Sequence, residues 1–164
     1  TLPPMPHEAW TATACVLNGR LYVMGGEGSN KLQVLEMTEE NGLSWSCKAD
    51  LPAIRADAAS VVHEGRIWVM GGEVGEEEEE TSASVITYDA EGDAWDVAPP
   101  LPSPCGGCSA AAMDGEIFVC HDSGVYKYGA GHGAGVGHGG AWQEDRAGAM
   151  GHAEFTVCEP LLLG

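Results

Sequence analysis

Basic residues are scarce in this 164-residue chain, and their scarcity excludes two classes of partner. Lys and Arg number 7 against 25 Asp and Glu, which gives a formal net charge of −18 at pH 7. Nucleic acids and anionic membranes are bound through positive surfaces, so we expect neither as a partner. No apolar run approaches the roughly 18 residues that a membrane-spanning helix requires.

The chain also has no basic-then-apolar leader and no Asn-x-Ser/Thr glycosylation site. Because it opens on Thr1 rather than Met, we expect that it begins inside a longer gene product. Four of its six cysteines lie in apolar or alternating runs, which fits small buried side chains in a reducing compartment. The cysteine pattern and the missing glycosylation site predict a cytoplasmic location, whereas the absent leader says little about a chain that begins inside a longer product.

Helical periodicity is hard to find anywhere in the chain. Instead, short apolar runs are separated by turns rich in Gly, Pro and Asp, and Gly alone accounts for 24 residues. Hydrophobic residues make up 44% of the chain, which is enough to form a core. The pattern predicts an all-β protein.

One pattern occurs three times along the chain. Residues 18–26, 64–72 and 114–122 align as a turn followed by an apolar strand, at offsets of 46 and 50 residues. A Leu-Pro pair precedes each copy, at residues 2, 51 and 101, and a Trp in a polar context follows each copy, at residues 45, 95 and 142. Such a period indicates a repeat architecture.

Each repeat predicts four short strands. The first strands (11–17, 58–63, 109–113) are rich in small residues and are joined to the second by two-residue turns ending in Gly. The second strands (21–24, 67–70, 117–120) are continuously apolar, so we expect both of their faces to be buried. The third strands cover 32–37, 83–89 and 124–128, and the fourth carry the Trp. Small inner and large outer side chains suit wedge-shaped sheets arranged around an axis.

These features resemble the kelch repeat. The matching residues are Gly25-Gly26, Gly71-Gly72, Tyr88 and the three Trp residues. The resemblance implies a partial β-propeller of four-stranded antiparallel blades within one kelch-repeat domain (1–164). The expected blades are 2–50, 51–100 and 101–148, and 149–164 would start a further blade. The third repeat departs from the pattern, with His121-Asp122 in place of Gly-Gly and a Gly-rich stretch at 129–140.

Three blades cannot close a ring, because propellers have roughly four to eight. The terminal blades would then expose apolar faces. We therefore expect the chain to be a segment of a longer propeller; the alternative is that two or more copies assemble into one ring.

Several motifs match the spacing of redox, metal or nucleotide sites but have a simpler structural interpretation. Cys105-Gly106-Gly107-Cys108 has C-x-x-C spacing, but neither a second pair nor a helix accompanies it. His132 and His138 lie in a Gly-rich stretch, and Gly135–Gly140 matches G-x-G-x-x-G without the helix that a dinucleotide site needs. Glu76–Glu80 is an acidic run that is either a solvated loop tip or a docking site for a basic partner. We expect no cofactor, no metal and no identifiable catalytic residue.

The resemblance also implies where a partner binds, since kelch propellers present loops at one face. The expected binding residues lie in the loops between second and third strands and at the entrances of the first strands: Glu27, Asn30, Lys31, Arg55, Asp57, Glu73, His121, Asp122 and Ser123. Arg55 is the strongest candidate, because kelch adaptors often place a ligand-contacting Arg at this position. The alternative is a structural Arg that pairs with Asp57 or with a backbone carbonyl.

By this resemblance the chain is expected to be a protein–protein interaction module, an adaptor or a scaffold, rather than an enzyme. The alternative is a fragment of a kelch-type enzyme, such as a sugar epimerase or oxidase acting in the mouth of the ring. That alternative requires polar residues converging on the first strands, of which His63 is the clearest.

Overall fold

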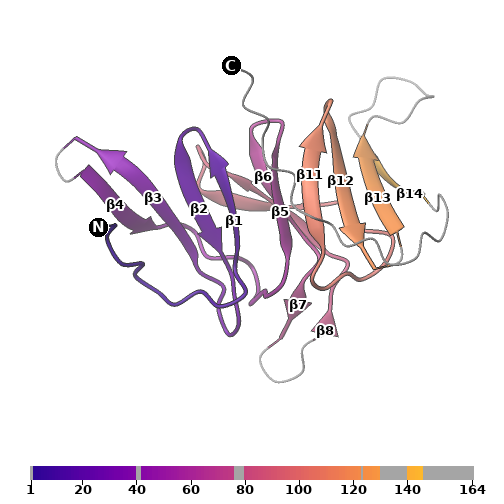
Figure 1. Ribbon diagram of the computed structural model, residues 1–164, viewed down its shortest axis with the longest axis horizontal. Coiled ribbons are helices and arrows are strands. Elements are labelled where there is room, and N and C mark those ends of the chain that lie inside the picture. Colours follow the sequence, from indigo (N-terminus) through magenta and orange to yellow (C-terminus); the bar gives the residue numbers. More distant parts are fainter. Residues whose placement is uncertain (1, 40–41, 76–79, 123, 130–139, 146–164) are drawn as a thin grey trace, which may run out of the picture.

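Three four-stranded antiparallel sheets make up this computed structural model, which describes residues 2–39, 42–75, 80–122, 124–129 and 140–145 (Figure 1). The first sheet, blade 1, contains β1 (Thr13–Leu17), β2 (Arg20–Met24), β3 (Leu32–Thr38) and β4 (Gly42–Cys47). Blade 2 contains β5 (Ala59–His63), β6 (Arg66–Met70), β9 (Val85–Asp89) and β10 (Ala94–Ala98). Blade 3 contains β11 (Ser109–Met113), β12 (Glu116–His121), β13 (Gly124–Gly129) and β14 (Ala141–Asp145). The all-β fold of four-stranded blades is as predicted.

A fourth, two-stranded sheet was not predicted. It is a short hairpin of β7 (Glu73–Val74) and β8 (Glu80–Thr81), which extends from blade 2 between β6 and β9. Residues 76–79 of the acidic run lie outside the described residues. Within the described part of the chain, no helix is long and apolar enough to span a membrane.

The first two strands of each blade are joined by the predicted two-residue turns. Both residues of each turn have positive φ, for example Glu64 at 49° and Gly65 at 73°. Two consecutive positive φ angles match the right-handed twist of the strands they join. Glu64 adopts this conformation although it has a Cβ, which costs about 1 kcal/mol.

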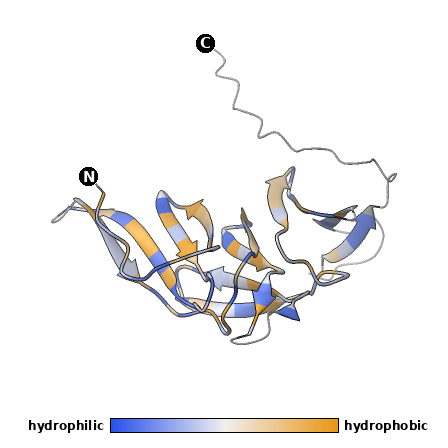
Figure 2. Ribbon diagram, turned by 60° about the horizontal axis from the view of Figure 1, so that its bottom comes forward, coloured by the Kyte–Doolittle hydropathy of each residue, from blue (hydrophilic) through white to orange (hydrophobic). Residues whose placement is uncertain are grey.

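The blades lie side by side, with their first strands adjacent. β5 contacts β1 on one side and β11 on the other, so these three strands form the inner edge of the arrangement (Figure 1). Two hydrophobic cores lie between the blades, and side chains that alternate along the strands supply them. Figure 2 shows the hydrophobic and hydrophilic positions along the strands of the blades. On β6, Ile67 and Val69 face blade 1, whereas Trp68 and Met70 face blade 3.

The expectation that every second strand is buried on both faces holds only for blade 2. β6 is buried almost throughout, but β2 and β12 alternate between buried and partly exposed residues. The reason is that blades 1 and 3 each have one neighbouring blade among the described residues, and blade 2 has two.

The tryptophan of each fourth strand ties its blade to the segment that enters that blade. The indole Nε1 of Trp95 donates to the carbonyl of Ala49 (2.9 Å), and Trp142 donates to Pro99 (2.8 Å). Trp45 donates to Pro3 (3.0 Å). Ala49 and Pro99 lie two residues before the Leu-Pro pairs at 51 and 101, so the matching pair in blade 1 is Met5-Pro6. The predicted anchor at Leu2-Pro3 was therefore wrong by three residues.

Candidate functional site

One end of the blades gathers the predicted binding residues, and we call it the loop face. It consists of the connections that enter the first strands (7–12, 50–58, 104–108) and those that join the second and third strands (25–31, 71–75, 80–84, 122). Backbone hydrogen bonds link these connections to one another. Asp57 donates to Thr11 (3.1 Å), and Gly107 donates to Asp57 (3.0 Å), so each blade entrance is bonded to the next.

The Gly-Gly pairs form the corners of these connections, where the backbones of neighbouring segments approach each other most closely. Gly26 donates to the carbonyl of Arg55 (2.7 Å), and Gly72 donates to that of Cys105 (2.6 Å), each across a blade interface. A Cβ on Gly71 would overlap the Cys105 carbonyl, and one on Gly72 would lie 2.5 Å from the Ala56 carbonyl. Both glycines also have positive φ, so the corner accepts only glycine without strain.

Arg55 lies beneath this face rather than on it. Its side chain is 5% exposed, and its guanidinium donates to the Gly71 carbonyl and to the Ser84 hydroxyl (2.6 Å). Burial lowers the pKa of Arg55. These contacts are those of the structural alternative, with a backbone carbonyl as partner. A direct contact between Arg55 and a ligand remains a prediction.

Three more of the predicted residues have their polar groups engaged within the chain. Lys31 Nζ pairs with Asp50 at 2.5 Å, and Asn30 Nδ2 donates to the Leu51 carbonyl (3.3 Å). The backbone of Glu73 pairs with Ala56 (2.8 Å), which fixes the hairpin of β7 and β8 against the entrance of β5. These residues brace the loops against the neighbouring blade entrance.

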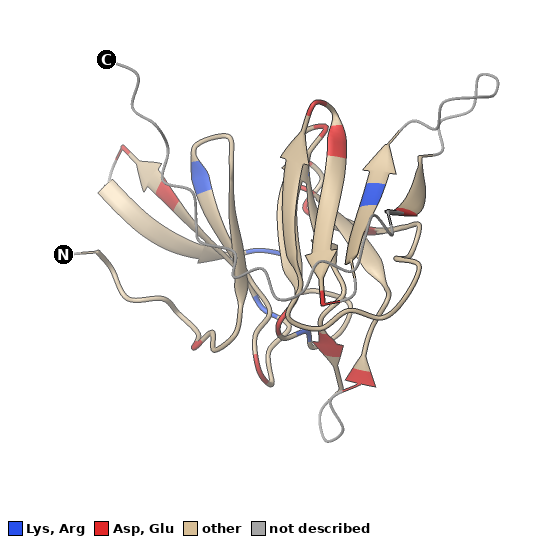
Figure 3. Cartoon of the chain, turned by 45° about the vertical axis from the view of Figure 1, so that its right-hand side comes forward, with Lys and Arg blue, Asp and Glu red and all other residues tan. Residues whose placement is uncertain are grey.

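Three of the remaining predicted residues present carboxylates at the surface. Glu27, Asp57 and Asp122 are exposed, whereas the His121 ring stacks on Tyr126 with centroids 4.2 Å apart. Ser123 lies outside the described residues. Figure 3 shows further acidic segments on β7 and β8 at this end, where Glu80 is also exposed.

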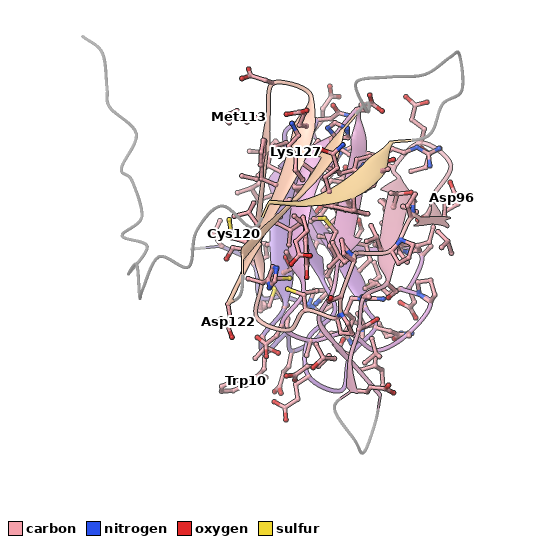
Figure 4. All side chains as sticks on the ribbon, turned by 90° about the vertical axis from the view of Figure 1, so that its right-hand side faces the viewer. Trp10, Asp96, Met113, Cys120, Asp122 and Lys127 are labelled. Atoms are coloured by element: carbon pink, nitrogen blue, oxygen red, sulfur yellow. The ribbon has the colours of Figure 1, made fainter. Side chains whose placement is uncertain are left out.

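Trp10 was missed by the sequence reasoning. Its side chain is 71% exposed, and its carbonyl accepts a bond from Glu27 N (2.9 Å). Trp10 and Asp122 lie at the same end of the molecule in Figure 4. The repeat offsets place Trp10 where the other blades have Ala56 and Gly106. A large aromatic among small equivalents was the signal that could have identified it.

A shallow hollow of about 320 Å³ lies beside the inner strands. Its lining comes from equivalent positions of the three blade entrances and from β1: Thr11, Ala12, Thr13, Ala14, Asp57, Ala58, Gly107 and Cys108. Asp57 is the one residue of this lining with a charged side chain. His63 does not belong to it, since His63 is buried against Trp68 with ring centroids 5.7 Å apart.

The C-x-x-C pair occupies the predicted position, at the entrance of β11. Both thiols are buried, and burial, followed by the neighbouring Cys108 thiol, raises the pKa of Cys105 to about 12. A thiol with a raised pKa stays protonated at neutral pH, the reverse of an activated redox cysteine. In the described segments, no cluster of three or more His, Cys, Asp or Glu side chains could hold a metal. His132 and His138 lie outside those segments, as do the G-x-G-x-x-G match (135–140, apart from Gly140) and the predicted start of a further blade (149–164).

Four-stranded blades packed side by side, with glycine N–H bonds across the blade interfaces and an indole bond to each entering segment, define a propeller-like repeat protein. The solved structure of YjhT has a similar fold: it superposes with a TM-score of 0.64 at 23% identity, over 72% of this chain and 35% of that one. At this identity the likeness shows the fold alone.

Sequence comparison supplies the family. Residues 54–102 match the Kelch motif. Kelch-like protein 35 of Mus musculus is 28% identical over 123 residues, which is 72% of this chain and 20% of that protein. The F-box/kelch-repeat protein At1g67480 of Arabidopsis thaliana is 35% identical over 125 residues, or 73% of this chain and 33% of that protein. Beta-scruin of Limulus polyphemus is 29% identical over 114 residues, or 65% and 12%.

The chain belongs to the kelch-repeat family. It spans about a fifth to a third of the length of the first three curated relatives. That the chain is a segment of a longer propeller remains a prediction.

Proposed function

We propose that this chain is a protein-binding module, of the adaptor or scaffold kind, that contacts its partner through the loop face. The observation that carries the proposal is the contrast between loop-face side chains that are bonded within the chain and loop-face side chains that are exposed. Arg55, Asn30 and Lys31 are engaged within the chain, whereas Trp10, Glu27, Asp57 and Asp122 project from loops held on rigid sheets. Binding residues commonly occupy such loops, and Trp is enriched among the residues that dominate protein interfaces.

The relatives support the same class of function. Their names join kelch repeats to an F-box or to a BTB domain, so in those proteins the repeats are one module among several. Binding of a protein partner by the present chain rests on this analogy together with the loop geometry.

The charges of the loop face select among partners. Of the two described cations there, Lys31 is paired with Asp50 and Arg55 is buried. The exposed carboxylates of Glu27, Asp57 and Asp122 consequently favour a partner surface that contains Lys or Arg. Such an interaction weakens as the salt concentration rises.

The test compares two charge-matched double variants as baits. Glu27→Lys with Asp122→Lys alters the loop face, and Glu39→Lys with Glu91→Lys alters exposed turns at the opposite end of the blades. Quantitative mass spectrometry then measures which proteins each bait and the wild-type chain capture. We expect a protein that the wild type and the opposite-end variant capture, and that the loop-face variant loses at least tenfold. Equal capture by both variants would overturn the proposal.

A further inference from the structure

Three equivalent backbone positions form the rim of the shallow hollow beside the inner strands. Thr11, Asp57 and Gly107 are related by the repeat offsets of 46 and 50 residues, and all three line the hollow. Each has a positive φ, between 48° and 62°. The N–H of Asp57 donates to the Thr11 carbonyl (3.1 Å), and the N–H of Gly107 donates to the Asp57 carbonyl (3.0 Å). The rim is therefore a bonded backbone framework on which only the side chains differ.

Asp57 supplies the only charge of this lining, and no described cation of the chain neutralises it. Its side chain is exposed, and none of the ion pairs among the described residues includes it. Arg55 is only two residues away, but its guanidinium extends into blade 2 and donates to the Gly71 carbonyl and the Ser84 hydroxyl. The Asp57 carboxylate is thus available to a cation from outside the chain.

Trp10 places an aromatic ring at the border of the same hollow. It directly precedes Thr11 of the rim, and its side chain is 71% exposed. Figure 4 shows Trp10 projecting at the loop-face end of the molecule. The Trp10 carbonyl accepts a bond from the N–H of Glu27 (2.9 Å), so a second exposed carboxylate belongs to the neighbouring loop. An exposed indole attracts a cation to its face, and the two flanking carboxylates favour the same charge.

The size and chemistry of the hollow suit one arginine side chain. Its volume of about 320 Å³ lies at the lower end of the range of pockets that hold small molecules. A guanidinium is planar, pairs with a carboxylate through two parallel N–H bonds and stacks on an aromatic face, whereas a lysine ammonium is a strongly hydrated point charge. The Thr13 hydroxyl, which donates to Ser60 (2.6 Å), keeps lone pairs that accept a further N–H.

We propose that the hollow binds an arginine side chain of the protein partner, with the guanidinium paired with the Asp57 carboxylate and stacked on the Trp10 indole. This inference rests on the proposed function, because it names the residue of the partner that the loop face recognises. Glu27 adds a second negative charge that attracts the same guanidinium. Since Thr11 and Gly107 occupy the equivalent positions of blades 1 and 3, the rim specifies arginine at one point only.

A peptide selection tests the inference without a known partner. Random peptides displayed on phage are selected on the immobilised wild-type chain, on Asp57→Asn and on Asp114→Asn. Asp114 is the matched control, because it is exposed, has a φ of 53° and lies in the turn at the opposite end of blade 3. Both changes remove one negative charge and keep a residue that tolerates positive φ. We expect peptides selected on the wild type and on Asp114→Asn to share an arginine that peptides selected on Asp57→Asn lack.

A double-mutant cycle on the best selected peptide then locates that arginine. Isothermal titration calorimetry compares the peptide with its citrulline analogue, in which a neutral urea group replaces the guanidinium. We expect Asp57→Asn and the citrulline analogue each to weaken binding at least tenfold, and their combination to add little, because both remove the same ion pair. Trp10→Leu is expected to weaken binding of the arginine peptide at least threefold. Asp114→Asn should bind within twofold of the wild type, and circular dichroism checks that each variant keeps its strand content.

Several results would overturn the inference. They are a selection that enriches no sequence, one that enriches lysine instead of arginine, losses for Asp57→Asn and citrulline that simply add, and a Trp10→Leu variant that binds as the wild type does. These results leave the proposed function standing, because it depends on which captured proteins the bait with Glu27→Lys and Asp122→Lys loses. Equal capture by the two double-variant baits is the separate result that overturns the proposed function.

Discussion

The interface between blades 1 and 2 and the interface between blades 2 and 3 share a backbone plan but differ in their side chains. At both, a corner glycine donates across the interface, Gly26 to the Arg55 carbonyl and Gly72 to the Cys105 carbonyl. At both, an indole donates to the entering segment. From the shared position, however, Arg55 extends a guanidinium into blade 2, whereas Cys105 packs its thiol beside Cys108.

The comparison teaches that the repeat specifies the path of the backbone. The side chain that is free to vary is that of the residue across the interface from the corner glycine. A corner glycine has no substitute, because backbone atoms fill the space where a Cβ would be. The residue across from the corner glycine contributes only its carbonyl to the shared plan, so its side chain is free to differ.

Among the variants that disturb the backbone contacts of these interfaces, Gly71→Ala is expected to have the largest effect on stability. The new Cβ would overlap the Cys105 carbonyl at φ +64°, and we expect a loss of about 3–5 kcal/mol in the free energy of unfolding. Gly65→Ala is the matched control, because Gly65 has nearly the same φ, +73°, with no heavy atom near the added Cβ. That variant should lose only about 1–2 kcal/mol. Urea denaturation measures both, and equal losses would show that φ alone, not the corner contact, requires glycine.

The next effect concerns the side chain that differs between the interfaces. Arg55→Met removes the donors to the Gly71 carbonyl and the Ser84 hydroxyl while keeping most of the buried volume, and we expect a loss of about 2–3 kcal/mol. Cys105→Ala at the equivalent position should lose about 1 kcal/mol, since it removes only a small buried group. Urea denaturation of the two variants measures the difference. If Arg55→Met is the milder change, the guanidinium does not stabilise the corner.

Most of the fold could be predicted because it depends on local patterns. The Asn18-Gly19 turn, the paired glycines and the spacing of Trp45, Trp95 and Trp142 each impose a local geometry, and together they specified three blades. The entry to blade 1 was misassigned because Leu2-Pro3 and Met5-Pro6 are alike as dipeptides. Only the bond from Trp45 to Pro3 reveals which of them occupies the repeated position.

The candidate site was less predictable, since exposure depends on neighbours distant in sequence. Arg55 looks like a surface residue when read alone, but Gly71 and Ser84 come from another part of the chain to bury it. Trp10 looks like a core residue, yet it is exposed because its position at the blade entrance projects outward. Sequence could place both residues at a blade entrance but could not determine which way each side chain points.

The smallest expected effect is a pH dependence that belongs to the first interface alone. Asp93 accepts hydrogen bonds from the Tyr88 hydroxyl (2.6 Å) and from the Ala49 N–H (2.8 Å), and these bonds lower the pKa of Asp93. The residue equivalent to Ala49 at the second interface is Pro99, which has no N–H to donate.

A carboxyl with a lower pKa in the folded state stabilises the fold above its unfolded pKa of about 4, and this contribution is lost as the pH falls through the folded pKa. Asp93→Asn removes the titration while keeping a residue that tolerates the positive φ of 49°. Because Asp93 is exposed, we expect the variant to be less stable by under about 1 kcal/mol at about pH 6 and to approach the wild type progressively as the pH falls below about 4. Urea denaturation across this range measures the convergence. Glu91→Gln, an equal charge change in the same turn, corrects for general charge effects, and a difference independent of pH would mean that the carboxylate does not hold the two blades together.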